Sequence, residues 1–121
     1  MNQDLENLRQ RLIREAKARR RVYYGDIAGI VHLDMGRPPD RNKIAQVLGE
    51  ISMYEHEHHR PMLTVIVVRK RDGTPGPGFF TLAQDLGRYS GNDDQAARRF
   101  LDAETERVWD YWSHNVETPA R

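Results

Sequence analysis

Residues 62–73 read Met62-Leu63-Thr64-Val65-Ile66-Val67-Val68-Arg69-Lys70-Arg71-Asp72-Gly73. The first seven are apolar or β-branched and show no helical stripe, which predicts a strand that is at least partly buried. The three basic residues that follow take the chain into solvent, and Asp72-Gly73 is a turn signal. We therefore expect a strand that ends in a basic turn.

The chain before this strand is predicted to be helical. Apolar residues at spacings of three and four, from Leu5 to Ala16, predict a first helix over residues 3–20. A second helix is expected from Tyr24 or Gly25 to His32. After a proline-containing break, Asp40 is a plausible N-cap for a third helix that continues to His58.

The chain after the basic turn predicts a loop and two more helices. Residues 74–78, in which Thr74 precedes alternating Pro and Gly, are expected to form the loop. A short helix is expected over residues 81–86, a last helix from Asp93 or Asp94, and a frayed tail from Val116. The prediction is one α+β, mostly helical domain over residues 1–121. It has a winged helix-turn-helix-like core (22–90), an N-terminal helix (1–20) and a C-terminal helix (93–115).

Composition limits the possible chemistry. The 121 residues contain no cysteine, which excludes disulfides, thiolate catalysis and cysteine-based zinc sites, and fits a reducing compartment. There is no apolar run of about 20 residues and no signal-peptide pattern at the N-terminus. We expect a cytoplasmic protein with no membrane contact.

Charge is distributed unevenly along the chain despite a formal net charge of +1. Seven basic residues between Arg9 and Arg21 stand against one acid, Glu15, whereas acids gather over residues 50–57 and 93–106. The basic segment is either a local phosphate-binding surface or a solvated helix whose arginines aid solubility. The sequence leaves both interpretations open.

The order of elements predicts a nucleic-acid interface. In a winged helix-turn-helix the second helix enters the major groove and the basic wing touches the backbone. The expected nucleic-acid-binding residues of the third helix are Arg41, Asn42, Lys43 and Gln46. Those of the wing are Arg69, Lys70 and Arg71.

Three short motifs carry a family resemblance. They are Val22-Tyr23-Tyr24-Gly25-Asp26-Ile27-Ala28, Val47-Leu48-Gly49 and Pro61-Met62-Leu63-Thr64-Val65-Ile66. With the Gly-bearing turn they resemble the DNA-binding domain of O6-alkylguanine alkyltransferases and alkyltransferase-like proteins, over residues 22–78. The resemblance implies that Tyr24 lies near a flipped nucleotide. It places Gln46 where the family has an arginine finger, a cation that Gln cannot replace.

The strand departs from that family at its reactive position. Met62 stands where the reactive cysteine would be, and Leu63 replaces the family's histidine. A thioether cannot act as a thiolate acceptor, so alkyl transfer is excluded. The chain is also similar to small uncharacterised bacterial proteins with a Pro-Gly-x-Gly-Phe segment, a likeness that implies no function.

Three further groups of residues have both a functional and a structural interpretation. The run Glu55-His56-Glu57-His58-His59 offers metal-ligand types, but we favour a solvated helix end and no metal. Residues 75–80 are either a ligand-contacting loop or a rigid turn anchored by Phe79 and Phe80. Glu104 is either a buried acid or a boundary residue paired with an arginine such as Arg107.

Two functions from different classes follow. The first is a non-catalytic nucleic-acid-binding protein without cofactor, using Tyr24 with the predicted helix and wing residues. The alternative is an interaction adaptor or accessory subunit that docks on a partner, or on a second copy, through its N- or C-terminal helix. A third possibility, a small nuclease or other enzyme, would need acids clustered near the basic turn.

Overall fold

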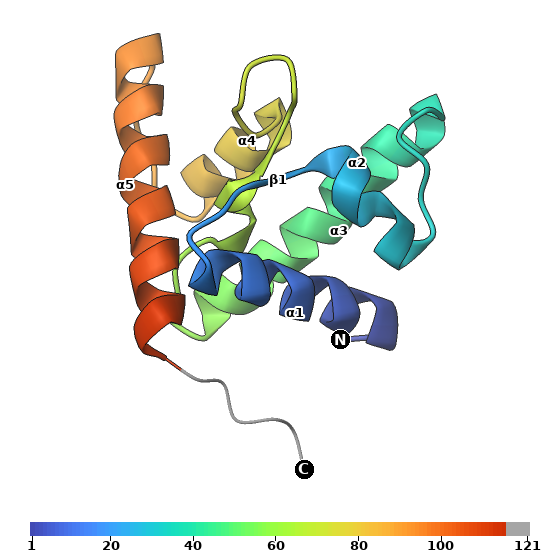
Figure 1. Ribbon diagram of the computed structural model, residues 1–121. Helices are drawn as coiled ribbons and strands as arrows, with labels where there is room; N and C mark the ends of the chain where they lie inside the picture. The colour runs from blue at the N-terminus through green and yellow to red at the C-terminus, as the bar shows by residue number, and fades with distance from the viewer. Residues whose placement is uncertain (116–121) are drawn as a thin grey trace.

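The computed structural model describes residues 1–115 and is a mostly helical α+β fold (Figure 1). Within residues 1–115, five α-helices and two short 3-10 helices accompany a sheet of two strands. In chain order they are α1 (Gln3–Lys17), β1 (Val22–Tyr23), α2 (Tyr24–Ile27), η1 (Ala28–Val31), α3 (Pro38–Glu57), η2 (Leu63–Ile66), β2 (Val67–Val68), α4 (Pro77–Asp85) and α5 (Asp94–His114). The expected mostly helical α+β class is confirmed.

Helix α1 is an integral part of the core. Its predicted apolar stripe is buried, and the helix packs against α5, η1 and η2 while crossing α3 (Figure 1). It ends at Lys17, three residues earlier than predicted, because Arg19 takes a left-handed backbone conformation (φ 55°). The stripe is therefore covered by this chain itself and is not available for a partner.

The β-branched run forms less strand than predicted. Only Val67 and Val68 are in a strand, which pairs in parallel with Val22 and Tyr23, and residues 63–66 form the 3-10 helix η2. The partner strand ends after two residues because α2 begins at Tyr24. Helices α1, α3 and α5 pack against η2, so its continuous apolar character reflects burial by helices rather than by a larger sheet.

The second and third predicted helices have different boundaries from those predicted. The second predicted helix is α2 followed by η1, and it ends where His32 has a φ of 61°. Helix α3 begins at Pro38 with Arg37 as N-cap, since proline suits the first turn of a helix. The prediction that Asp40 caps this helix is wrong. Its buried carboxylate instead accepts a hydrogen bond from the Asp34 backbone N–H at 2.9 Å.

The last two helices confirm one predicted cap and correct one boundary. Helix α4 begins at Pro77, inside the predicted loop, because Pro77 occupies the first turn and Gly76 precedes it as N-cap. Asp93 caps α5 as predicted, accepting from the Ala96 N–H at 2.7 Å. The predicted frayed tail from Val116 lies outside the described residues. No helix within residues 1–115 is long and apolar enough to cross a membrane.

Candidate nucleic-acid interface

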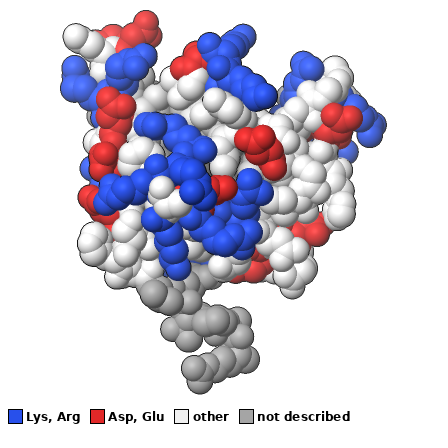
Figure 2. Space-filling view, viewed as in Figure 1, with Lys and Arg blue, Asp and Glu red and all other residues white. Residues whose placement is uncertain are grey.

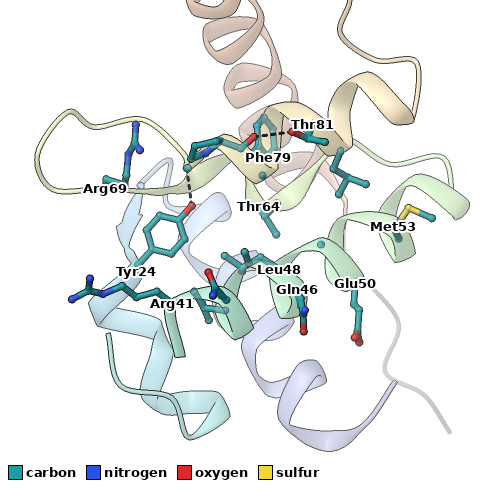
Figure 3. Close-up of a pocket in the computed structure, with 18 of the residues that line it drawn as sticks. Tyr24, Arg41, Gln46, Leu48, Glu50, Met53, Thr64, Arg69, Phe79 and Thr81 are labelled. Atoms are coloured by element: carbon teal, nitrogen blue, oxygen red, sulfur yellow. Dashed lines mark hydrogen bonds between the residues drawn. The ribbon is translucent and has the colours of Figure 1, made fainter. Parts of the chain in front are cut away.

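A groove with a volume of about 1630 Å³ lies between α3 and α4 (Figure 3). Its wall is completed by α2 and by residues 69–76, the loop that joins β2 to α4. Buried side chains line its base, including Leu48 of α3, Thr64 of η2 and Phe79 of α4. Three segments that are distant in sequence therefore form one concave surface.

Seven of the eight predicted nucleic-acid-binding residues line this groove. They are Tyr24, Arg41, Asn42, Gln46, Arg69, Lys70 and Arg71. Lys43 is the exception: it is exposed on α3 but does not line the groove. Because α3 turns about 100° per residue, Asn42 and Gln46 share a face with Gly49 and Met53, which also line the groove.

The polar side chains on the α3 face have free hydrogen-bonding capacity. Across residues 1–115, no hydrogen bond engages the amide groups of Asn42 or Gln46, and both side chains are exposed. Arg41 donates through Nε to the Met35 carbonyl at 2.8 Å, which fixes the orientation of its guanidinium at the groove edge. These groups can hydrogen-bond a ligand without breaking bonds within the fold.

Tyr24 connects α2 to the loop before α4. Its phenolic oxygen accepts a hydrogen bond from the Gly76 N–H at 2.9 Å (Figure 3). Burial raises the pKa of Tyr24, although this hydrogen bond partly opposes the rise. A Cβ at position 76 would lie 3.3 Å from the same oxygen, so glycine permits the close approach. Tyr24 is therefore neutral and held in place at the groove wall.

Residues 69–74 form a closed, cross-linked loop rather than a free arm. The Arg69 N–H donates to the Thr74 carbonyl at 2.9 Å, and Gly73, with a φ of 68°, donates to the Arg69 carbonyl at 2.8 Å. Asp72 receives the Arg69 guanidinium at 2.7 Å. A backbone hydrogen bond from Thr74, followed by the Thr74 hydroxyl and Arg69, lowers the pKa of Asp72. The predicted turn at Asp72-Gly73 is confirmed.

Within this loop the three basic residues have different surroundings. Asp72 pairs closely with Arg69 and also lies 3.8 Å from Nε of Arg71, whereas no ion pair within residues 1–115 engages Lys70. Lys70 and Arg71 are both exposed. Lys70 places its Nζ 5.4 Å from the ring centroid of Tyr23, a cation–π contact. Tyr23 also lines the groove and was not among the predicted site residues. Its position as an aromatic residue directly before Tyr24 was the sequence feature that could have indicated it.

The two ends of the groove carry opposite charge. Arg41 and Arg69 lie near Tyr24, while Glu50 and Met53 lie toward the other end (Figure 3). Lys70 and Arg71, which directly follow Arg69, and Asp85, the last residue of α4, also line the groove. Met53 is 37% exposed. Phosphate groups are attracted to the first end and repelled from the second.

The run Glu55–His59 is not wholly a solvated helix end. Glu55 is fully buried and accepts from Arg9 at 2.9 Å and from Arg60 at 3.0 Å. The Arg9 guanidinium also lies 4.8 Å from the Tyr54 ring centroid. Among residues 1–115, no three His, Asp or Glu side chains are arranged to hold a metal ion. Glu55 therefore has a structural role, which the sequence did not reveal because Arg9 is 46 positions away.

Glu104 is a buried acid paired with arginines. It accepts from the Met62 backbone N–H and from Arg107, both at 2.8 Å, and from Arg88 at 3.4 Å. Arg88 in turn donates to Nδ1 of His56 at 2.9 Å. Glu104 does not line the groove, and the expected Arg107 pairing is present.

The groove is thus built from α2, α3, the 69–76 loop and α4, with a cationic end and an acidic end. Comparisons of this chain with protein-family models, with curated proteins and with solved structures found no match.

Proposed function

We propose that this protein binds nucleic acid through the cationic end of the groove. The observation that carries the proposal is the convergence of groups from three separate segments: Arg41 of α3, Lys70 and Arg71 of the loop, and Tyr24 of α2. Lysine and arginine contact phosphates, and these contacts supply most of the affinity.

The amide side chains provide a means of contacting bases. Asn42 and Gln46 are exposed on the groove face of α3, and amides can donate to and accept from base edges. Helix α3 then acts as the recognition helix of a winged helix-turn-helix-like unit, and residues 69–74 act as its wing. Strand β2 pairs in parallel with β1, and therefore residues 69–74 do not close an antiparallel hairpin. The wing would instead be shaped by the Arg69–Thr74 and Arg69–Asp72 bonds.

The proposal also draws on the resemblance to alkyltransferase-like proteins. Tyr24 lies on its wall, and buried Thr64 of the third motif lies at its base. Met62, at the position of the family's reactive cysteine, is fully buried and offers no thiolate. We therefore propose binding without alkyl transfer.

Removing two groove cations and two distant cations gives a matched test. The variant Lys70→Ala/Arg71→Ala is compared with Arg98→Ala/Arg99→Ala, whose side chains are exposed on α5 and outside the groove. Fluorescence anisotropy of a labelled duplex DNA measures both affinities at low salt. We expect about a tenfold or larger loss only for the groove variant, because two phosphate contacts are removed. Equal affinities for the two variants would reject the site.

Protein docking is the second candidate function, and the exposed Met53 favours it. This side chain lies near Glu50 and Asp85 at the acidic end of the groove, a surface suited to a basic segment with an apolar anchor. Deleting α1 does not discriminate between the candidates, because α1 is buried in the core. Replacing Met53 with Ser discriminates between them. If the protein docks a partner here, the variant loses that partner, whereas DNA affinity at the cationic end is unchanged.

A further inference from the structure

A dense group of cations covers the C-terminal half of α1 and the approach to β1 (Figure 2). We name it the α1 basic face, and it consists of Arg11, Arg14, Lys17, Arg20 and Arg21. None of these residues lines the groove. The face is a second positively charged surface.

One carboxylate opposes the five cations at this face. Glu15 accepts from Arg20 at 2.7 Å and from Arg11 at 3.0 Å. Burial raises the pKa of Glu15, but its hydrogen bonds to Arg20 and Arg11 and their charges outweigh that effect and lower it. Glu15 is thus ionised near neutral pH, and five cations against one acid leave four positive charges in excess.

Three of these cations are available to an external anion. Across residues 1–115, no ion pair engages Arg14, Lys17 or Arg21, and all three are exposed. The Arg21 guanidinium lies 5.0 Å from the ring centroid of Trp109, which leaves its charge unneutralised. Arg19, which lies between Lys17 and Arg20, does not belong to this face because its side chain is paired with Asp110 of α5 at 2.5 Å.

The α1 basic face adjoins the cationic end of the groove through β1. Arg21 comes directly before this strand, and Tyr23 within it is 42% exposed and lines the groove. Lys70 lies over the Tyr23 ring. Figure 2 shows basic side chains gathered over α1 and again at the 69–73 loop, with uncharged and acidic side chains between the two groups. An exposed aromatic ring between cations is a surface on which nucleic-acid backbone and bases are both accommodated.

The opposite direction along the groove is unfavourable for phosphates. Glu50, Glu57 and Asp85 line that end, and like charges repel a polyanion. A nucleic acid anchored near Arg41 and Lys70 therefore gains more contacts by passing over β1 than by following α3 toward its C-terminus.

We infer that the bound nucleic acid leaves the groove across Tyr23 and continues over the α1 basic face. This inference rests on the proposed nucleic-acid-binding function and names the path of that ligand. Arg14 and Lys17 then contact phosphates that the groove alone does not reach.

The test uses three double variants and one 20-base-pair duplex, titrated over a range of salt concentrations. Arg14→Ala/Lys17→Ala removes two cations of the face, and alanine is well tolerated at exposed helix positions. Lys70→Ala/Arg71→Ala reports on the groove, and Arg98→Ala/Arg99→Ala is the control. Unchanged thermal unfolding verifies that each variant is folded. We expect the face variant to lose affinity about tenfold and the slope of log affinity against log salt to fall by about two.

Each other outcome overturns either the path over the α1 basic face, the groove proposal, or both. A face variant that binds like the control, with a weakened groove variant, overturns only the path. A weakened face variant with an unaffected groove variant overturns the groove proposal and the continuous path with it. A parent protein that binds no DNA overturns both. Binding to phosphatidylserine vesicles that requires Arg14 and Lys17, without DNA binding, would assign the face to a membrane surface instead.

Discussion

The phenolic oxygen of Tyr24 accepts the backbone N–H of Gly76, 52 residues further along the chain, at 2.9 Å. This bond joins the start of α2 to the residue that caps α4. It closes the wall of the groove at the end where Arg69, Lys70 and Arg71 are held. The position of the basic loop relative to α3 therefore depends on a contact between distant segments.

Replacing Tyr24 with Phe removes this acceptor and leaves the Gly76 N–H without it. We expect a loss of about 1 kcal/mol in the free energy of unfolding, the usual net value of one hydrogen bond. Urea denaturation measures it. Tyr89→Phe is the control, because no hydrogen bond within residues 1–115 engages the Tyr89 hydroxyl. Equal losses in both variants would show that the Tyr24–Gly76 bond contributes nothing specific.

Replacing Glu55 with Gln breaks a buried charge network. Arg9 and Arg60 would keep their charges while losing the carboxylate between them. We expect destabilisation of about 3–5 kcal/mol, the cost of leaving a buried charge uncompensated. Glu57→Gln on the same helix is exposed and should change stability by less than about 0.5 kcal/mol. Thermal and urea unfolding of both variants measure the difference, and a mild effect at Glu55 would contradict the assigned role.

The ion pairs of Glu15 should make the free energy of unfolding depend on pH in the acidic range. Its pKa is lowered in the folded protein, so its stabilising effect is full above the ordinary value near 4.5 and is lost as the pH falls through the lower folded value. The Glu15→Gln variant should be less stable than the parent at pH 7, and the difference should shrink below about pH 4.5. Urea unfolding at a series of pH values tests this. A difference that is constant with pH would contradict it.

The acidic end of the groove predicts variants that bind more tightly. Removing the charges of Glu50 and Glu57 together, by substitution with Gln, eliminates repulsion of phosphates near the bound ligand. We expect DNA affinity to rise about two- to fivefold at low salt, with a smaller gain at high salt because screening weakens the repulsion. Anisotropy titrations measure both conditions. Asp102→Gln, an exposed acid on α5, is the control and should leave affinity unchanged.

Local signals in the sequence were sufficient for most of the helices and for the turn. The spacing of Leu5, Leu8 and Leu12 predicts α1 because one helical face is buried along its length. Asp93 caps α5 through its own side chain, and Gly73 takes the positive φ that the turn requires. Each of these features depends on residues within one or two turns of chain.

Features that depend on distant partners could not be predicted. The β-branched run 63–66 became a 3-10 helix because three helices enclose it and β1 offers only two residues for pairing. Asp40 does not cap α3, because its buried carboxylate accepts a hydrogen bond from the backbone N–H of Asp34 instead. In the groove, residue type indicated the seven lining residues, but the compensation of Arg69 by Asp72 and the approach of Tyr23 to Lys70 required the fold.

The salt dependence of DNA binding by the unaltered protein is the direct test of the proposed nucleic-acid interface. A labelled duplex is titrated with the protein at about 50 and 200 mM salt, and fluorescence anisotropy reports binding. We expect micromolar or tighter binding at the lower salt and a steep loss at the higher salt, because phosphate contacts displace counterions. Absence of binding at low salt, or an affinity that does not change with salt, would contradict it.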